Sequence, residues 1–187
     1  MLTVREVSSA GYRSLRSIRF PVDALSVFVG ANGVGKTNLY RALELLQSAA
    51  AGTLTRDLAA AGGMESALWA GQRKRGDKAQ IRLMVELADD DGGSIPLGYE
   101  VGVGLVQQYE VRVGLRAPAQ AGFLLEPQVK AESLVQLTGR RPVTLLERDG
   151  PGGFVRDLEG RKQAIGTPLL ASETALASLQ NAPSFPE

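Results

Sequence analysis

The chain has 187 residues, of which 44% are hydrophobic, a size that supports one domain with a sizeable core, with or without a small appended lobe. Its 21 basic and 20 acidic residues leave a formal net charge of +1, so overall charge does not favour DNA or an anionic membrane as a partner. The absence of cysteine and histidine excludes disulfides, catalytic triads and metal sites with Cys or His ligands.

The first 50 residues predict strands, a loop and a helix. Residues 2–7 and 12–20 have the alternating pattern of strands, and the apolar run at 24–30 is typical of a short buried strand. After a glycine-rich loop, residues 37–50 place leucines at helical spacing. Because this start contains no unbroken apolar segment, we expect neither a signal peptide nor a membrane span, and a cytoplasmic location.

The remaining residues fall into three regions. Residues 51–77 are rich in small residues and glycine and predict an irregular connection. Residues 78–165 predict an antiparallel β lobe, with alternating runs at 81–87, 99–105 and 109–115 and a hairpin around 149–153. Residues 166–187 predict the start of a helical segment whose first turn is capped by Ser172.

Residues 30–37, GANGVGKT, fit the phosphate-binding pattern G-x-x-x-x-G-K-[ST]. Glycines let the backbone aim successive N–H groups at phosphate oxygens, and the helix that follows presents its positive N-terminal end. Lys36 is expected to reach the β- and γ-phosphates, and Thr37 to place its hydroxyl on Mg²⁺. The pattern therefore predicts a nucleotide site that takes ATP and Mg²⁺.

The loop and its surroundings resemble the RecF/SMC/OLD-like branch of the ABC-type P-loop ATPases. That branch has G-x-N-G-x-G-K-[ST]-N, which the chain matches at Gly30, Asn32, Gly33, Gly35, Lys36, Thr37 and Asn38. The stretch GYRSLRSIRFP at 11–21 also precedes the loop as in these proteins. Residues 60–71 and 168–187 are similar to the small bacterial predicted ATPases of the branch.

This resemblance implies a fold class and an assembly. The fold is α/β, the N-terminal half of a P-loop NTPase of the ABC ATPase head type, with a large antiparallel β lobe. Residues 1–187 are expected to form a single head fragment, divided at 50, 77 and 165 as above. In such proteins two heads sandwich two ATP molecules, so the intact protein is expected to form a homodimer through its heads.

The chain departs from the family pattern in three motifs. It has no apolar strand ending in Asp-Glu, the Walker B motif that supplies the base for the attacking water, and no signature motif or histidine switch. The segment most similar to a Walker B strand ends at Glu147, and we interpret it as part of a hairpin. Asp89, Asp90 and Asp91 are interpreted as turn carboxylates. We therefore expect no catalytic residue in this chain and place the missing motifs in a C-terminal half.

The predicted site comprises the loop, the residue that follows it and one arginine that the resemblance places near the nucleotide. The candidate nucleotide-binding residues are Gly30, Ala31, Asn32, Gly33, Val34, Gly35, Lys36, Thr37, Asn38 and Arg13, with Thr37 as the Mg²⁺ ligand. A glutamine senses Mg²⁺ in the family, and Gln163 and Gln180 are the available candidates, neither in a convincing context. The basic run Arg73, Lys74, Arg75 and Lys78 is interpreted as a solvated loop rather than a DNA contact.

Three functions remain open at this point. The first is the ATP-binding domain of a RecF/SMC/OLD-like ATPase whose intact form hydrolyses ATP. The second is a P-loop kinase or GTPase of another class, which the absence of an N-K-x-D motif and the β lobe disfavour. The third is a module that binds nucleotide without hydrolysing it.

Overall fold

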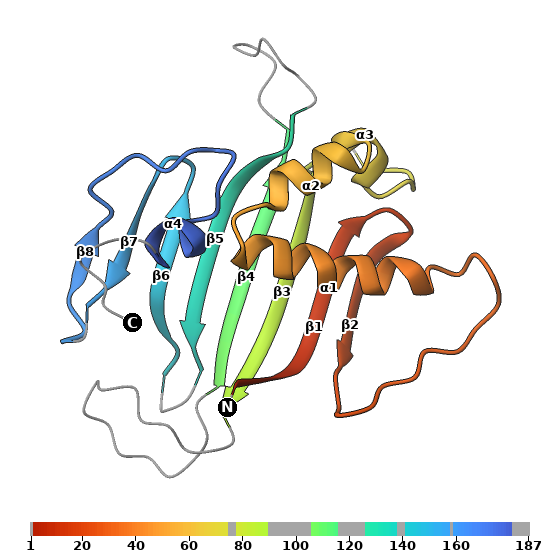
Figure 1. Ribbon diagram of the computed structural model, residues 1–187, viewed down its shortest axis with the longest axis horizontal. Coiled ribbons are helices and arrows are strands. Elements are labelled where there is room, and N and C mark those ends of the chain that lie inside the picture. The colour runs from red at the N-terminus through yellow and green to blue at the C-terminus, as the bar shows by residue number, and fades with distance from the viewer. Residues whose placement is uncertain are drawn as a thin grey trace.

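The structure is a computed structural model that describes residues 2–74, 78–89, 106–115, 126–137, 141–157 and 159–180. These residues form one 8-stranded antiparallel sheet in the order β2-β1-β3-β4-β5-β6-β7-β8 (Figure 1). The strands are β1 (Leu2–Tyr12), β2 (Leu15–Pro21), β3 (Gln80–Asp89), β4 (Val106–Gly114), β5 (Gln128–Gln136), β6 (Val143–Asp149), β7 (Gly152–Arg156) and β8 (Lys162–Ala164). The predicted α/β fold with a large antiparallel sheet is thus confirmed.

Alternation of apolar and polar side chains explains the central strands. Ile81 and Leu83 of β3 lie opposite Val113 and Val111 of β4, and all four side chains are fully buried. Arg82, between the two β3 residues, is exposed on the other face. The predicted strands at 81–87 and 109–115 are therefore confirmed, whereas the run at 99–105, Asp90 and Asp91 lie outside the described residues.

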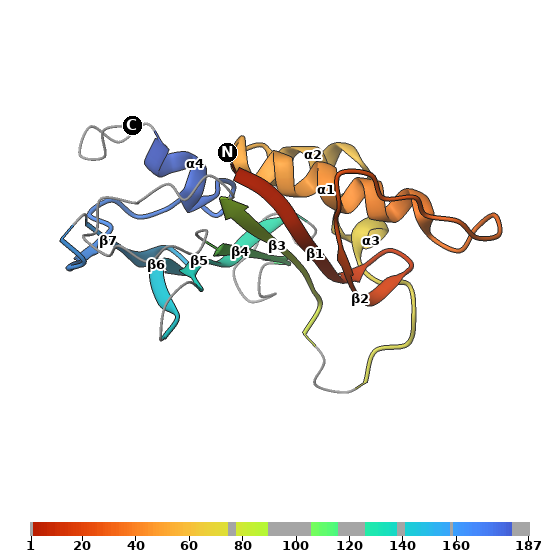
Figure 2. The same ribbon diagram turned by 90° about the horizontal axis from the view of Figure 1, so that it is seen from below.

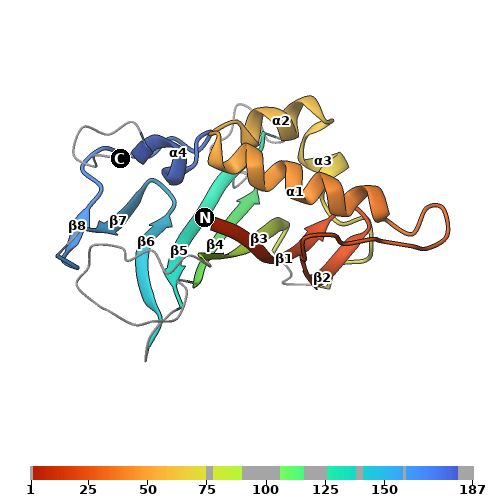
Figure 3. The same cartoon turned by 60° about the horizontal axis from the view of Figure 1, so that its bottom comes forward.

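The helices α1 (Lys36–Ala50), α2 (Leu54–Ala60) and α4 (Ala175–Gln180) lie on one face of the sheet (Figures 2 and 3). The main core lies between α1 and this face, where Leu39, Ala42 and Leu45 of α1 belong to one buried cluster with Val7 of β1. Because these helical residues recur every three or four positions, one side of α1 is apolar. This burial confirms the helix predicted at 37–50.

The run at 24–30 is not a buried strand, contrary to the prediction. It has no strand partner among the described residues, and Leu25, Val27 and Val29 are 82%, 73% and 88% exposed. Only the opposite side of the run packs, with the Phe28 ring edge-on to Phe20 at 5.3 Å between centroids. A strand needs neighbours that supply backbone hydrogen bonds, and its own residues cannot provide them.

The connection at 51–77 is less irregular than predicted. It contains α2 and the short helix α3 (Gly63–Ala67), which bury Leu54, Leu58 and Met64 against the core. Their apolar residues recur at helical spacing, but the surrounding alanines and glycines obscure that pattern. The predicted irregular structure holds for residues 70–74, which follow α3.

The C-terminal segment is anchored by contacts that sequence patterns did not indicate. Helix α4 begins at Ala175, and Ser172 does not cap it. Instead, Thr174 Oγ1 accepts a hydrogen bond from the backbone N–H of Ala177 at 3.4 Å, and the Glu132 carboxylate of β5 accepts one from the N–H of Ala175. Strand β5 itself was not predicted, and its residues tie α4 to the sheet.

Candidate nucleotide site

The predicted phosphate-binding loop lies where the segment that follows β2 turns into α1 (Figure 1). Gly33 and Gly35 have φ angles of 84° and 104°, a left-handed conformation that favours glycine. Gly35 is the N-terminal cap of α1, with no side-chain hydrogen bond to its first turn. The positive end of a helix of 15 residues therefore opens directly onto the loop.

Lys36 is folded back onto the start of the loop. Its Nζ donates hydrogen bonds to the carbonyl oxygens of Gly30 at 2.6 Å and Ala31 at 2.8 Å. Among the described residues, none accepts a hydrogen bond from the N–H groups of Gly33 through Thr37. The ammonium group and a row of backbone donors therefore share one small region, which is the arrangement a polyphosphate requires.

The turn between β1 and β2 supports the loop from the side of the sheet. Asn38 Nδ2 donates a hydrogen bond to Ser14 Oγ at 2.8 Å. The same hydroxyl stands 2.5 Å from the point where a Cβ on Gly35 would lie. The predicted residue Asn38 thus acts as a brace, and Ser14, which sequence reasoning missed, is its partner; only its place in the GYRSL stretch hinted at it.

Arg13 occupies the same turn in a strained conformation. It is the only non-glycine residue with a positive φ in the described part of the chain, at 47°. Its N–H donates to the Ala67 carbonyl at 2.8 Å, and its own carbonyl accepts from the N–H of Ala70 at 2.9 Å. Its guanidinium carbon lies 5.7 Å from the centre of the Tyr12 ring, and its buried Nε has no hydrogen-bond partner in the described residues.

Tyr12 keeps a neutral hydroxyl beside this arginine. Burial raises the pKa of Tyr12 above its ordinary value, although the charges of Arg13 and Arg41 act in the opposite direction. The phenol is therefore protonated at neutral pH, and the guanidinium of Arg13 has no counter-charge from this neighbour.

The remaining sequence candidates lie elsewhere. Gln163 is on β8, at the opposite edge of the sheet from β2, where its Nε2 donates to Asp157 Oδ2 at 2.9 Å. Nothing is described of the Gln180 side chain. Glu147 is exposed on β6, opposite Phe154 of β7, which confirms the hairpin interpretation.

Gly35→Ala is expected to weaken ATP binding more than Gly33→Ala. Both changes place a Cβ at positive φ, which costs about 1–3 kcal/mol, but only the Cβ at position 35 meets another atom, Ser14 Oγ at 2.5 Å. The loss at position 35 is expected to exceed tenfold, measured by titration with a fluorescent ATP analogue. Adding Ser14→Ala to Gly35→Ala should restore part of the affinity; equal losses for both glycine variants would contradict this account.

Comparison with known protein families agrees with this geometry. The family model described as "AAA domain, putative AbiEii toxin, Type IV TA system" matches residues 25–132, more than half of the chain. The chain belongs to this family. It is an AAA-type P-loop ATPase domain, as the predicted resemblance to the small bacterial AAA-family ATPases implied.

Comparisons of this AAA domain with solved structures and with curated proteins show less similarity than the family model does. A solved SMC ATPase chain, from structural work on ATP-driven dimerization and DNA-stimulated activation of SMC ATPases, is 17% identical with a TM-score of 0.42. The match covers 74% of this chain and 70% of that one. No curated protein matches the chain. Among the described residues, no helix of the AAA domain is long and apolar enough to cross a membrane.

Proposed function

We propose that this AAA domain binds ATP with Mg²⁺ through residues 30–38 and Arg13, as the nucleotide-binding part of an ABC-type ATPase head. The observation that carries the proposal is the unpaired row of backbone N–H groups around Lys36 at the start of α1. Such donors are fixed by the backbone and bind phosphate oxygens without rearranging the fold.

The side chains of the site fit the triphosphate and its metal. The ammonium group of Lys36 donates hydrogen bonds to two carbonyl oxygens of its own loop. Phosphate oxygens can replace these carbonyl oxygens as acceptors, and their negative charge makes the hydrogen bonds stronger. Thr37 is exposed in the first turn of α1, where its hydroxyl is available to hold Mg²⁺. The ion would neutralise charge on the β- and γ-phosphates.

Arg13 is proposed as an additional phosphate contact. It follows Tyr12 and precedes Ser14, whose hydroxyl touches the loop through Asn38. Its buried Nε has no partner among the described residues, which is unusual because buried donors are nearly always paired. A phosphate oxygen would satisfy that donor, and strained backbone of the kind seen at Arg13 is concentrated at binding sites.

We further propose that hydrolysis belongs to the intact protein, in a head-to-head dimer. The chain has no Walker B carboxylate or signature motif, and Glu147 lies in the hairpin that β6 and β7 form. In the ABC-type heads that the chain resembles, the strand before the loop lies in a RecA-like core. We propose this position for the exposed run at 24–30 in the intact protein.

The test is a titration of the 187-residue chain with ATP, GTP and a panel of phosphate acceptors, each with Mg²⁺. We expect saturable ATP binding, a rate of phosphate release close to background, and no transfer to any acceptor. Preference for GTP or transfer to an acceptor would favour a different P-loop class. Rapid turnover by this chain alone, abolished by Lys36→Met, would contradict the proposed need for a second half.

A further inference from the structure

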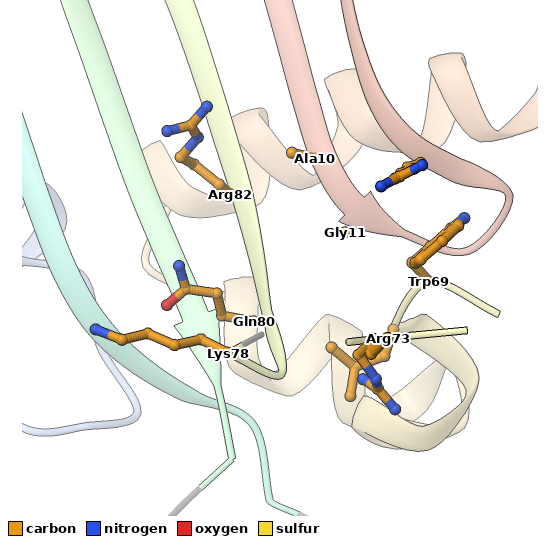
Figure 4. Close-up of a pocket in the computed structure, with 9 residues that line it drawn as sticks. Ala10, Gly11, Trp69, Arg73, Lys78, Gln80 and Arg82 are labelled. Atoms are coloured by element: carbon orange, nitrogen blue, oxygen red, sulfur yellow. The ribbon is translucent and has the colours of Figure 1, made fainter. Parts of the chain in front are cut away.

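A hollow of about 490 Å³ lies at the end of the sheet where β1 finishes and β3 begins (Figure 4). Gly11 of β1 lines one side, Gln80 and Arg82 of β3 line another, and Trp69 and Arg73 of the segment after α3 line a third. The volume is within the range of pockets that bind small molecules. The interpretation of the basic run as an ordinary solvated loop does not anticipate that Arg73 and Lys78 line a hollow.

This hollow opens on the face of the sheet that α1 does not cover. Ile81 and Leu83 point into the core under α1, so Arg82 between them points to the opposite face. Arg82 lies across from Ala10 of β1, which also lines the hollow. In Figure 2 the segment that follows α3 runs on the side of the sheet away from α1.

Four cationic side chains line the hollow, and none of its lining residues in the described part of the chain is acidic. They are Arg16, Arg73, Lys78 and Arg82. Within the described ranges, none of the four side chains is paired with a carboxylate or hydrogen-bonded to a carbonyl, unlike Arg19, Arg112 and Arg161, which all form ion pairs. Cations gathered in a concave surface raise the local positive potential, even though the whole chain is nearly neutral.

Trp69 holds one of these cations in place. The guanidinium carbon of Arg16 lies 5.3 Å from the centre of the indole ring. Gly71 packs closely against the same ring, because a Cβ at position 71 would lie 2.1 Å from it. The half-buried indole is therefore a fixed support, and Arg16 loses less freedom when it binds an anion than a free surface arginine does.

We infer that this hollow is a binding site for a ligand with at least two phosphate charges, separate from the phosphate-binding loop. Guanidinium groups match phosphate oxygens with paired N–H donors, and three of the four cations are arginines. Leu68 and Trp69 add an apolar wall for the body of a phosphate ester. The phosphates can belong to a nucleic-acid strand or to a free polyphosphate, and the experiment separates these two sources.

The experiment uses the fluorescence of Trp69, the only tryptophan in the chain, in the Lys36→Met background so that binding at the loop does not contribute. One titration adds inorganic tripolyphosphate, and the other adds a 12-nucleotide oligothymidylate. We expect a saturable change in emission with at least one ligand, and weaker binding at higher salt. Binding of the oligonucleotide alone identifies a strand as the source, whereas binding of tripolyphosphate identifies a free phosphate group as sufficient.

Two double variants test the location of the site. Arg73→Gln with Arg82→Gln removes two charges from the hollow and is expected to lower the affinity at least tenfold. Arg56→Gln with Arg141→Gln removes two exposed charges that do not line the hollow and should leave the affinity within twofold. Equal losses in both pairs, or no binding of either ligand at low salt, would overturn the inference.

Discussion

Lys36→Met is expected to lower the affinity of the chain for ATP at least a hundredfold. In the structure Lys36 Nζ donates to two carbonyl oxygens of the loop, and on nucleotide binding we expect it to donate to the β- and γ-phosphates instead. Methionine keeps most of the side-chain length but removes the charge and all three donors. The loss therefore reports the interaction with phosphate rather than a change of volume.

Thermal unfolding gives a second measurement of the same change. ATP at 100 times its dissociation constant stabilises a protein by about 2.7 kcal/mol, which for a chain of this size raises Tm by about 5–10 °C. The Lys36→Met variant should lose this increase and retain nearly the same Tm without nucleotide, because Lys36 makes only exposed hydrogen bonds.

Lys162→Met is the matched control for Lys36→Met. It also removes one exposed lysine charge, from β8 at the far edge of the sheet, where Nζ lies 4.1 Å from the Phe154 ring centre. ATP affinity should be unchanged in this variant. If Lys36→Met bound ATP as tightly as Lys162→Met, the proposed function of the loop would be wrong.

Glu132→Ala is expected to destabilise the fold by about 3–5 kcal/mol, the range for breaking a buried ion pair. Glu132 of β5 and Arg148 of β6 have side chains with 0% exposure, and Arg148 Nη1 lies 3.1 Å from Glu132 Oε2. The carboxylate also accepts hydrogen bonds from the Tyr109 hydroxyl at 2.9 Å and from the N–H of Ala175. Removing it leaves a buried guanidinium without its counter-charge.

The contacts of Arg148 explain why we expect the loss of stability in Glu132→Ala to extend to the C-terminal segment. Its Nε donates to the Gly150 carbonyl at 2.8 Å and its Nη2 to the Leu170 carbonyl at 2.7 Å. The ion pair thus ties two strands to the segment that leads into α4. In Glu132→Ala we expect faster amide hydrogen exchange at 170–180 in addition to a lower free energy of unfolding.

Denaturant unfolding with two further variants tests this account. Glu147→Ala, an exposed carboxylate on the neighbouring strand, should change stability by less than about 0.5 kcal/mol. Glu132→Ala combined with Arg148→Ala should cost less than the sum of the two single changes, because the second removes the charge left unpaired by the first. If the destabilisation of the double variant equalled the sum of the two single losses, the two residues would act independently, contrary to this account.

Tyr109 makes the stability of this cluster depend on pH in base. Burial, with the neighbouring charge of Glu132, raises the pKa of Tyr109 above the range in which proteins are studied. The hydroxyl therefore stays protonated and continues to donate to Glu132 in the folded protein. The unfolded chain loses this proton near the ordinary pKa of tyrosine, about 10, so the stability that Tyr109 contributes falls as the pH rises above that value. We expect Tyr109→Phe to remove the hydrogen bond to Glu132 and also this loss, so that the free energy of unfolding of the variant, measured with denaturant, decreases less steeply with pH in base.

Local patterns predicted the elements whose own residues show a clear periodicity. The helix at 37–50 has its own apolar side, and the strands at 81–87 and 109–115 alternate clearly between apolar and polar residues, so a pattern in neighbouring residues identifies each element. The same patterns failed at 24–30, because an apolar run becomes a strand only where another strand supplies hydrogen bonds. They also failed at α2 and α3, where helical spacing is weak among many small residues.

By itself, the sequence determined the P-loop ATPase family and predicted the position of the phosphate-binding loop, because a loop that binds phosphate through its backbone requires particular residues at particular spacings. Only the tertiary structure decided what surrounds that loop. Ser14 meets Asn38 across a separation of 24 residues, Glu132 meets Arg148 in the core, and Arg16 joins Arg73, Lys78 and Arg82 around one hollow. These groups come together because of strand order and register, which no local pattern contains.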